Sequence, residues 1–551
     1  MFLNRIWIWL KTPQGAKAWR PGLVLLYLLT AVGLVSKLSE YYVPGYGFTY
    51  LIGQGDEPVR EFDWIEERDV TVYRHFRSSG YDAQYYAQLA LDPALRDPTL
   101  AQSVDNVPYR ARRILLPWTA FLLGFGQANW VLNVYALQNV VCWFLLGFLL
   151  LRWFPPTDFA RAFRWLAIML SIGIWFSAFF SLVDGPSLLL LALALRWIER
   201  GQQGWATAVL ALSGLAKETN LLGAAVLAPE RWQSLKGWGR AVLQGILVAI
   251  PLVIWFLFLR QRFAETGSLA GARNFAWPFQ AYGERWVELF QAAIGGETRW
   301  KFLSTGLATH ISVTVQALFL LLWWQWKNAA WRLTVPFAAL AFVLGYAVWE
   351  GYPGASSRVL LPMLLGFNLL VPYARRWWPI LVLGNLTMWI GPISLEPRPG
   401  ETYSVQIESA PQLLALEKGR ADLEVEFPRP WYRAERNRKR QWRWSESDAD
   451  IVINNPYPVA LEIEIRGEWS AQTDRTARLT QNGTLLWQQP ITPRPREWRL
   501  AGIRLEPGEN RLRVESDAHN VVANPGDERR LAVCLLRFSI KGRVAEIDAT
   551  D

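Results

Sequence analysis

The chain contains few of the side chains that form disulfides or bind transition metals. Two cysteines and three histidines occur among 551 residues. Cys142 lies in an apolar segment and Cys534 in the polar C-terminal part, so they are not expected to pair, and a disulfide framework is excluded. His75, His310 and His519 are scattered, and no Cys/His spacing typical of a zinc site occurs.

Motifs for nucleotides and nucleic acids are also missing. Neither a Walker loop nor a GxGxxG sequence precedes a helix in a strand–helix context. The net charge of +10 would ordinarily favour a nucleic-acid partner, but the basic residues occur in short segments between apolar runs. No nucleic-acid partner and no metal ligand set are therefore predicted. Asp and Glu side chains still leave a divalent ion open as a cofactor.

Apolar and aromatic residues dominate the first part of the chain. Hydrophobic residues make up 52% of the sequence, yet the mean hydropathy is only +0.10. A long apolar part, residues 1–395, is therefore averaged with a long polar part. The apolar run 114–126 predicts a helix of about 20 Å, shorter than the ~30 Å hydrocarbon core, and is assigned to an interfacial or re-entrant helix. The other hydrophobic runs predict eleven membrane-spanning helices, at 21–38, 130–151, 165–181, 186–198, 205–217, 219–229, 241–259, 303–325, 333–349, 359–374 and 378–394.

Basic segments and acid-bearing breaks alternate between these predicted spans. The positive-inside rule places the basic segments, and with them the N-terminus, in the cytoplasm. An odd number of spans then places residues 396–551 on the opposite side. The long first loop, 39–113, also lies on that extracytoplasmic side, where ionisable residues at membrane depth predict a functional site. The basic segments contain Arg5, Lys11, Lys17, Arg20, Arg152, Arg161, Arg164, Arg196, Arg200, Arg231, Lys236, Arg240, Lys327, Arg332, Arg375 and Arg376.

The first loop contains SGYDAQYYAQLALDP at 79–93, which predicts a helix that carries a carboxylate. Asp82 is the candidate general base, and Gln84 and Tyr85 are candidate substrate contacts. The alternative is that Asp82 is only the N-cap, because Asp before an apolar-periodic run is a common helix start. Spacing alone leaves both interpretations open.

Two arginines and an aspartate are further candidates on the same side. Arg110 and Arg113 precede the short interfacial helix, where they can bind a phosphate or, equally, ordinary anionic lipid headgroups. Asp184 starts a predicted helix with Pro186 in its first turn, so an N-cap role is expected whatever else it does.

Charges at two other span ends complete the candidate set. Lys217 and Glu218 lie between two short predicted spans, at a depth that requires surrounding protein or water. They are interpreted either as substrate-binding residues or as an internal Lys–Glu pair that holds the hairpin. Arg358, at the mouth of the tenth span, either neutralises a phosphate or extends its charge to the interface.

Four segments in order, GYDAQYY, YRARRILLPW, DGPSLLLLALAL and GLAKETNLL, resemble the GT-C superfamily. The resemblance covers about residues 20–230 well and the rest loosely. It implies a polytopic α-helical membrane protein of the bacterial cytoplasmic membrane that acts in the cell envelope. The implied activity is inverting transfer of a sugar, hexosyl or pentosyl, from a polyprenyl-phosphate donor to a glycan, lipid or protein acceptor. A single acidic residue, Asp82, stands where some relatives carry a paired acidic motif, which leaves metal dependence undecided.

The resemblance also implies roles for the candidate residues. Asp82 would accept the proton of the acceptor hydroxyl as that hydroxyl attacks the anomeric carbon. Cationic side chains would stabilise the departing lipid phosphate. The implied set of substrate- and phosphate-binding residues comprises Gln84, Tyr85, Arg110, Arg113, Asp184, Lys217, Glu218 and Arg358.

Residues 396–551 show the pattern of a small all-β domain. Short runs such as ALEIEIRGEW and NRLRVES alternate with period two, and turn signals such as QNGT separate them. This predicts a β-sandwich, similar to the jelly-roll-like tails of some bacterial glycosyltransferases. A transporter or flippase, or a non-catalytic membrane scaffold that presents the sandwich, remains the alternative function; a transporter favours polar residues at the midplane and inverted repeats, and neither is detected.

Overall fold

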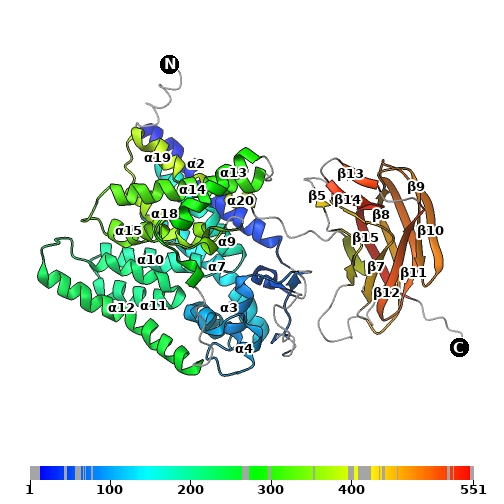
Figure 1. Cartoon of the computed structure of the whole chain (residues 1–551), viewed down its shortest axis with the longest axis horizontal. Coiled ribbons are helices and arrows are strands. Elements are labelled where there is room, and N and C mark those ends of the chain that lie inside the picture. The colour runs from blue at the N-terminus through cyan, green and yellow to red at the C-terminus, as the bar shows by residue number, and fades with distance from the viewer. Residues whose placement is uncertain are drawn as a thin grey trace, which may run out of the picture. The chain divides into compact units, whose positions relative to one another are not determined.

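The computed structural model divides the chain into two compact units, Met1–Glu396 and Pro397–Asp551, of which the first is helical and the second is built of strands (Figure 1). Arg5, Lys11 and His519 lie outside the described residues. The structure describes residues 13–42, 46–55, 64–65, 68, 70–75, 78–263, 272–295, 300–351, 354–394, 403–407, 423–432, 435–436, 441–455, 457–517, 521–524 and 527–545.

Long apolar helices form the frame of the first unit. Among the described residues, four helices are long and apolar enough to cross a membrane, and five if a pair bent by 43° is counted as one span. The four are α2 (Pro13–Ser39), α7 (Ala128–Leu150), α12 (Leu235–Arg262) and α14 (Trp300–Leu322), and the bent pair is α8 (Phe159–Met169) with α9 (Ile172–Phe179).

The remaining predicted spans are shorter than expected, so the count of eleven is not confirmed. At 1.5 Å per residue, the 16 residues of α10 reach about 24 Å, less than the hydrocarbon core. The segment 219–229, predicted as an α-helix, is a 3-10 helix, η4 (Glu218–Leu227). In η4, Asn220 donates to Ser213 O, and Gly223 lies against Leu191 so closely that a Cβ would come within 2.7 Å of it. The other short helices are α10 (Asp184–Glu199), α11 (Gln203–Ala216), α15 (Ala329–Ala341), α16 (Tyr346–Trp349), α17 (Ser356–Val359), α18 (Leu361–Leu370), α19 (Trp378–Leu383) and α20 (Gly391–Ser394).

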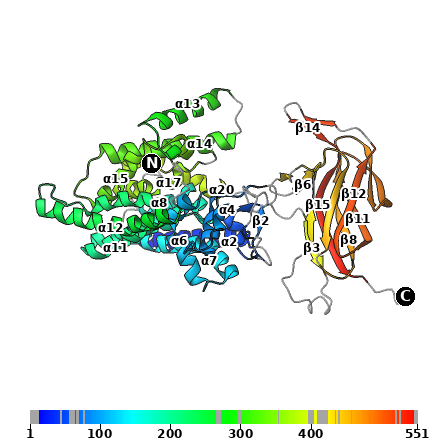
Figure 2. The same ribbon diagram turned by 60° about the horizontal axis from the view of Figure 1, so that its bottom comes forward.

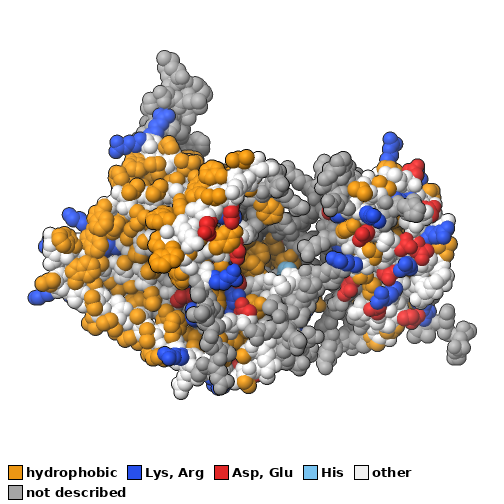
Figure 3. All heavy atoms as spheres, in the orientation of Figure 1, with side chains coloured by type: hydrophobic (Ala, Val, Ile, Leu, Met, Phe, Trp, Pro, Cys, Tyr) orange, Lys and Arg blue, Asp and Glu red, His pale blue; other side chains and the backbone are white. Residues whose placement is uncertain are grey.

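Packing explains why such short helices are stable. The helices α10, α11 and α12 lie side by side (Figures 1 and 2), and α10 buries most of its apolar residues in the core of the unit. By contrast α12 leaves Val242, Ile254 and Leu257 about 60% exposed. Figure 3 shows a largely hydrophobic surface on this unit. An exposed apolar face of this extent is typical of contact with lipid.

The first loop folds into short helices that pack against α7. It contains α3 (Asp82–Leu91), α4 (Leu100–Ser103), α5 (Val107–Arg110) and η3 (Ala111–Arg113). The helix predicted at 114–126 follows the loop as α6 (Leu115–Leu123), and α3 and α6 both contact α7. Asp97 helps to fix the loop, because Trp64 Nε1 donates to its carboxylate and Arg68 forms an ion pair with it. The hydrogen bond from the Thr99 hydroxyl lowers the pKa of Asp97 to about 2.

The second unit has two large sheets around a shared apolar core and a separate two-stranded sheet of β13 and β14. The five-stranded sheet has the order β10-β9-β12-β7-β4, and the six-stranded sheet has the order β11-β8-β15-β6-β5 with β3 beside β15. Ile451, Leu512, Ile463 and Leu535, from both sheets, lie in one buried cluster, as a sandwich requires. The strands are β3 (Tyr403–Ile407), β4 (Glu424–Glu426), β5 (Glu435–Arg436), β6 (Gln441–Trp444), β7 (Ala449–Asn455), β8 (Leu461–Ser470), β9 (Arg475–Gln481), β10 (Thr484–Ile491), β11 (Arg496–Leu505), β12 (Gly508–Ser516), β13 (Val521–Asn524), β14 (Asp527–Leu531) and β15 (Cys534–Val544).

The turn predicted from QNGT is confirmed. Asn482 and Gly483 have φ values of 51° and 81° and join β9 to β10 as an antiparallel hairpin. Asn–Gly is the preferred pair where both central residues need positive φ.

Candidate functional site

Asp82 is the first residue of α3 and does not cap it. The N-cap is Tyr81, whose extended backbone has φ −133° and ψ 171°, and no side chain caps the helix. The interpretation of Asp82 as the N-cap is therefore wrong, because the N-cap is the preceding residue, Tyr81. Its Oδ1 accepts a hydrogen bond of 2.9 Å from Arg110 Nη1, and 41% of its side chain is exposed. Within the described part of the chain, Asp82 Oδ2 has no hydrogen-bond partner.

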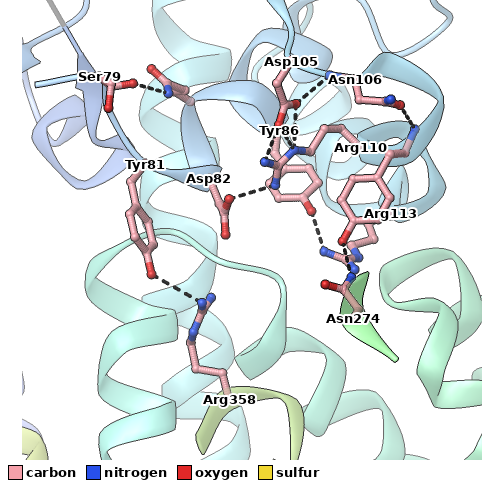
Figure 4. A network of polar contacts seen from close by, with 12 residues as sticks. Ser79, Tyr81, Asp82, Tyr86, Asp105, Asn106, Arg110, Arg113, Asn274 and Arg358 are labelled. Carbon is pink, nitrogen blue, oxygen red and sulfur yellow. Dashed lines mark hydrogen bonds and ion pairs between the residues drawn. The ribbon is translucent and has the colours of Figure 1, made fainter. Parts of the chain in front are cut away.

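Arg110 is held between two carboxylates. Its Nε and Nη2 donate to Asp105 at 2.9 and 2.7 Å, while Nη1 reaches Asp82 (Figure 4). Asn106 caps α5 by accepting from Tyr109 N at 2.8 Å, which fixes the turn that carries the arginine. Sequence reasoning did not identify Asp105, although DNVPYR places an acid before an N-cap and five residues before Arg110. The contacts of Arg110 with Asp105 on one side and Asp82 on the other fix the orientation of its planar guanidinium group.

Arg113 binds an acid that lies 105 residues further along the chain. Its Nε and Nη2 each donate 2.9 Å bonds to the two oxygens of Glu218, and Nη1 donates to the Tyr86 hydroxyl at 2.7 Å. Glu218 is thus paired with Arg113, and the interpretation of Lys217 and Glu218 as a pair that holds their own hairpin is wrong. Lys217 is the C-cap of α11 and Glu218 begins η4, and the two side chains contact different partners.

Asp184 joins two cations from distant segments. Lys217 Nζ donates to its Oδ1 at 2.6 Å, and Arg358 Nη1 donates to its Oδ2 at 3.4 Å. All three residues are buried, with exposed fractions of 8% or less. Asp184 does not cap α10 as expected, because Val183 holds the N-cap position and no side chain caps the helix. Its carboxylate is instead engaged by the two cations.

Tyr81 connects this group to Asp82. Arg358 Nη2 donates to the Tyr81 hydroxyl at 3.3 Å, and Tyr81 directly precedes Asp82 in the chain. In Figure 4, Tyr81, Asp82 and Arg358 lie to one side of Arg110 and Arg113. Tyr81 and Tyr86 were not identified from sequence, where GYDAQYY offered only aromatic periodicity.

Gln84 and Tyr85 have mainly structural contacts. The Gln84 amide accepts from Gly55 N at 3.3 Å and donates to Ser79 O at 2.9 Å, so it fastens the chain before α3. Gly80 has a φ of +82°, and a Cβ there would meet Gln84 Oε1 at 2.2 Å. The Tyr85 ring lies 4.8 Å from the Arg110 guanidinium carbon, close enough for a cation–π contact.

Three ion-paired groups, linked through Tyr81 and Tyr86, make up what we call the acid–base cluster. Its members are Asp82, Asp105, Arg110, Arg113, Asp184, Lys217, Glu218 and Arg358. It contains four acids and four bases, so its formal charge is zero when all are ionised. Every base has a carboxylate partner, and these contacts hold the cations in place. Asp82 is the acid with the largest exposed fraction, 41% against 32% for Asp105, 24% for Glu218 and 6% for Asp184.

Such an arrangement can do two kinds of chemistry. The partly free carboxylate of Asp82 can accept a proton, and the arginine and lysine side chains can bind phosphate oxygens. In the described ranges no group of three or more His, Cys, Asp or Glu residues is placed to hold a metal ion.

Comparisons with known proteins give a weak structural likeness and no sequence match. No family model and no curated protein sequence matches this chain. A solved structure, the arabinosyltransferase EmbB from Mycobacterium smegmatis, aligns over 94% of this chain with 12% identity and a TM-score of 0.27. The alignment covers 64% of the EmbB chain, so this chain spans less than two thirds of its length. Agreement at this level assigns neither family nor activity.

Proposed function

We propose that the protein is an inverting, GT-C-type glycosyltransferase that uses a polyprenyl-phosphate-linked sugar. One observation carries the proposal: a half-exposed carboxylate, Asp82, lies in a cluster with four cations from three segments of a unit whose helices are long and apolar enough to span a membrane. A base beside several phosphate-binding groups matches the needs of this reaction.

The proposed reaction is a single displacement. The acceptor hydroxyl attacks the anomeric carbon, the bond from that carbon to the phosphate oxygen breaks, and polyprenyl phosphate departs with the electron pair. Asp82 Oδ2 accepts the hydroxyl proton. Attack from the side opposite the leaving group inverts the anomeric configuration. No step requires a redox partner.

The cluster's cations would stabilise the leaving phosphate. Arg110 is hydrogen-bonded to Asp82, and Arg358 and Lys217 are held by Asp184. Because these cations are fixed by acids before substrate binds, they need little reorganisation when negative charge develops. Protonation of Asp82 would also leave the cluster with a net positive charge as the phosphate becomes more negative.

We further propose the topology deduced from the charge pattern, with residues 396–551 and the cluster outside the cytoplasm. Contacts in the structure are consistent with these sides. The residues assigned outside, from four regions of the chain, contact one another in the cluster. Residues assigned inside also meet, because Trp153 Nε1 donates to Glu199. Arg164, also assigned inside, donates to Pro372 O near the end of the predicted tenth span.

Cysteine labelling tests this topology. In a variant with Cys142 and Cys534 replaced by Ser, exposed positions are available at Gln202, assigned inside, and Thr473, assigned outside. A membrane-impermeant maleimide added to spheroplasts should label Thr473→Cys, and should label Gln202→Cys only after permeabilisation. The reverse pattern would exclude the proposed orientation.

Replacement of Arg358 should slow transfer. Arg358→Gln removes one cation from the leaving-group side, and loss of one such preorganised donor costs ~10²–10³-fold in rate. Arg358→Lys keeps the positive charge but loses the planar guanidinium group whose two nitrogens contact Asp184 and Tyr81, so an intermediate rate is expected. The measurement is single-turnover transfer by the purified variants, with thermal midpoints recorded to separate activity from folding. Equal rates for wild type and Arg358→Gln would remove Arg358 from the mechanism.

Mass spectrometry of glycans and lipid-linked sugars, in cells with and without the protein, tests the function itself. If the protein is a glycosyltransferase, cells without it should accumulate the lipid-linked donor and lack the glycosylated product. A transporter or flippase would change the side on which a lipid-linked sugar accumulates, and the purified protein would form no new glycosidic bond. If the protein is a scaffold, wild-type protein and Asp82→Asn should have the same effect on the lipid-linked sugars and on the glycans.

A further inference from the structure

A hollow of about 730 Å³ lies at the start of α12, beside the segment that joins α14 to α15. Its lining includes four tryptophans together with one acid and one base: Trp232, Trp238, Trp324, Trp326, Glu230 and Lys327. None of the acid–base cluster residues lines it. By the charge pattern of the sequence it belongs to the cytoplasmic side, where Arg231, Lys236 and Lys327 lie.

Hydrogen bonds and ring stacking hold part of the hollow's walls. Trp326 Nε1 donates to Pro229 O at 3.0 Å, which ties the α14–α15 segment to the chain before α12. Trp238 Nε1 donates to Trp232 O at 2.7 Å, and Arg332 Nη1 donates to Trp326 O at 2.7 Å. The Trp324 and Trp326 rings stack with centroids 6.0 Å apart. A site with walls held in this way loses little conformational entropy when a ligand binds.

Lone tryptophans are common at membrane interfaces, where they serve as anchors. This hollow differs in that its lining combines the tryptophans with an exposed acid, Glu230, and an exposed base, Lys327. Opposite charges in one aromatic hollow complement a zwitterion: a ligand ammonium group contacts Glu230 and the indole faces, and a ligand phosphate contacts Lys327.

We propose that this hollow binds the headgroup of a zwitterionic phospholipid with a primary ammonium group, that is, phosphatidylethanolamine. A lipid is favoured over a soluble zwitterion because α12 continues from the hollow with an exposed apolar face. Leu235 is 87% exposed and Val242 is 59% exposed, which provides a surface for the acyl chains. The site is independent of the proposed transfer reaction.

Native mass spectrometry of the full-length protein in detergent tests the proposal. Phosphatidylethanolamine, phosphatidylglycerol of the same acyl chains, and free phosphoethanolamine are added in separate titrations. We expect phosphatidylethanolamine to bind at least ~10-fold more tightly than phosphatidylglycerol, as one added ion contact and a cation–π contact imply. Glu230→Gln and Trp324→Ala should each weaken phosphatidylethanolamine binding by ~10-fold, to near the phosphatidylglycerol level.

Lys236→Gln is the matched control, because Lys236 is an exposed cation of the same segment that does not line the hollow. It should bind phosphatidylethanolamine as wild type does, and unchanged thermal midpoints should show that all variants fold. Equal affinity for the two lipids, or full binding by Glu230→Gln, would overturn the proposal. So would equal loss in Lys236→Gln, since binding would then reflect general surface charge. Free phosphoethanolamine bound as tightly as the lipid would show that the ligand is soluble.

Discussion

Asp82→Asn should lower the rate of sugar transfer by ~10²–10⁴-fold while the protein remains folded in the membrane. The amide matches the carboxylate in shape and can still accept a hydrogen bond from Arg110, but it cannot take the acceptor's proton. Asp82 is not the N-cap of α3, so no cap is lost. The expected structural cost is the loss of a negative charge in the first helical turn, ~0.3–1 kcal/mol, together with the ion pair to Arg110, which keeps its second partner Asp105. The measurement is single-turnover transfer by purified protein, with the thermal midpoint followed in parallel.

Two further variants separate catalysis from positioning. Asp105→Asn weakens the hold on Arg110 without touching the proposed base, so it should raise KM for the donor more than it lowers kcat. Glu40→Gln removes an exposed acid that, among the described residues, forms its ion pair with Lys37 outside the cluster, and it should leave transfer unchanged. Wild-type turnover by Asp82→Asn would eliminate Asp82 as the base.

Asp184→Asn should destabilise the protein by ~3–5 kcal/mol, because it leaves Lys217 and Arg358 buried without an anion. The effect should appear as a lower thermal midpoint in detergent, whatever substrate is present. It is expected to exceed any effect of Glu40→Gln, since an exposed ion pair contributes ~0–1 kcal/mol.

The double variant Asp184→Asn/Lys217→Met tests the cause of this loss. It removes one of the two unmatched cations, so its midpoint should lie between those of wild type and Asp184→Asn. If Asp184→Asn melts as wild type does, the buried ion pairs do not stabilise this region. If the double variant is less stable than the single variant, the loss comes from packing and not from uncompensated charge.

Sequence alone was sufficient for features that depend on neighbouring residues. Apolar runs predicted the long helices α2, α7, α12 and α14, because a stretch of about twenty apolar residues is typical of a helix that crosses the hydrocarbon core of a membrane. Period-two alternation marked the strands, and Asn482–Gly483 marked a hairpin, because the required backbone angles restrict the residues that fit. These signals are local, so no knowledge of packing was needed to read them.

Only the tertiary structure decided which charges meet. Arg113 and Glu218 are 105 positions apart, and Asp184 and Arg358 are 174 apart, so sequence suggested Lys217 with Glu218 instead. Helix length was decided in the same way, since α10 is shielded by its neighbours and η4 is wound as a 3-10 helix where Gly223 packs against Leu191. Pair choice and helix termination depend on long-range packing and on the cost of an unpaired buried charge, and neither is encoded in a local pattern.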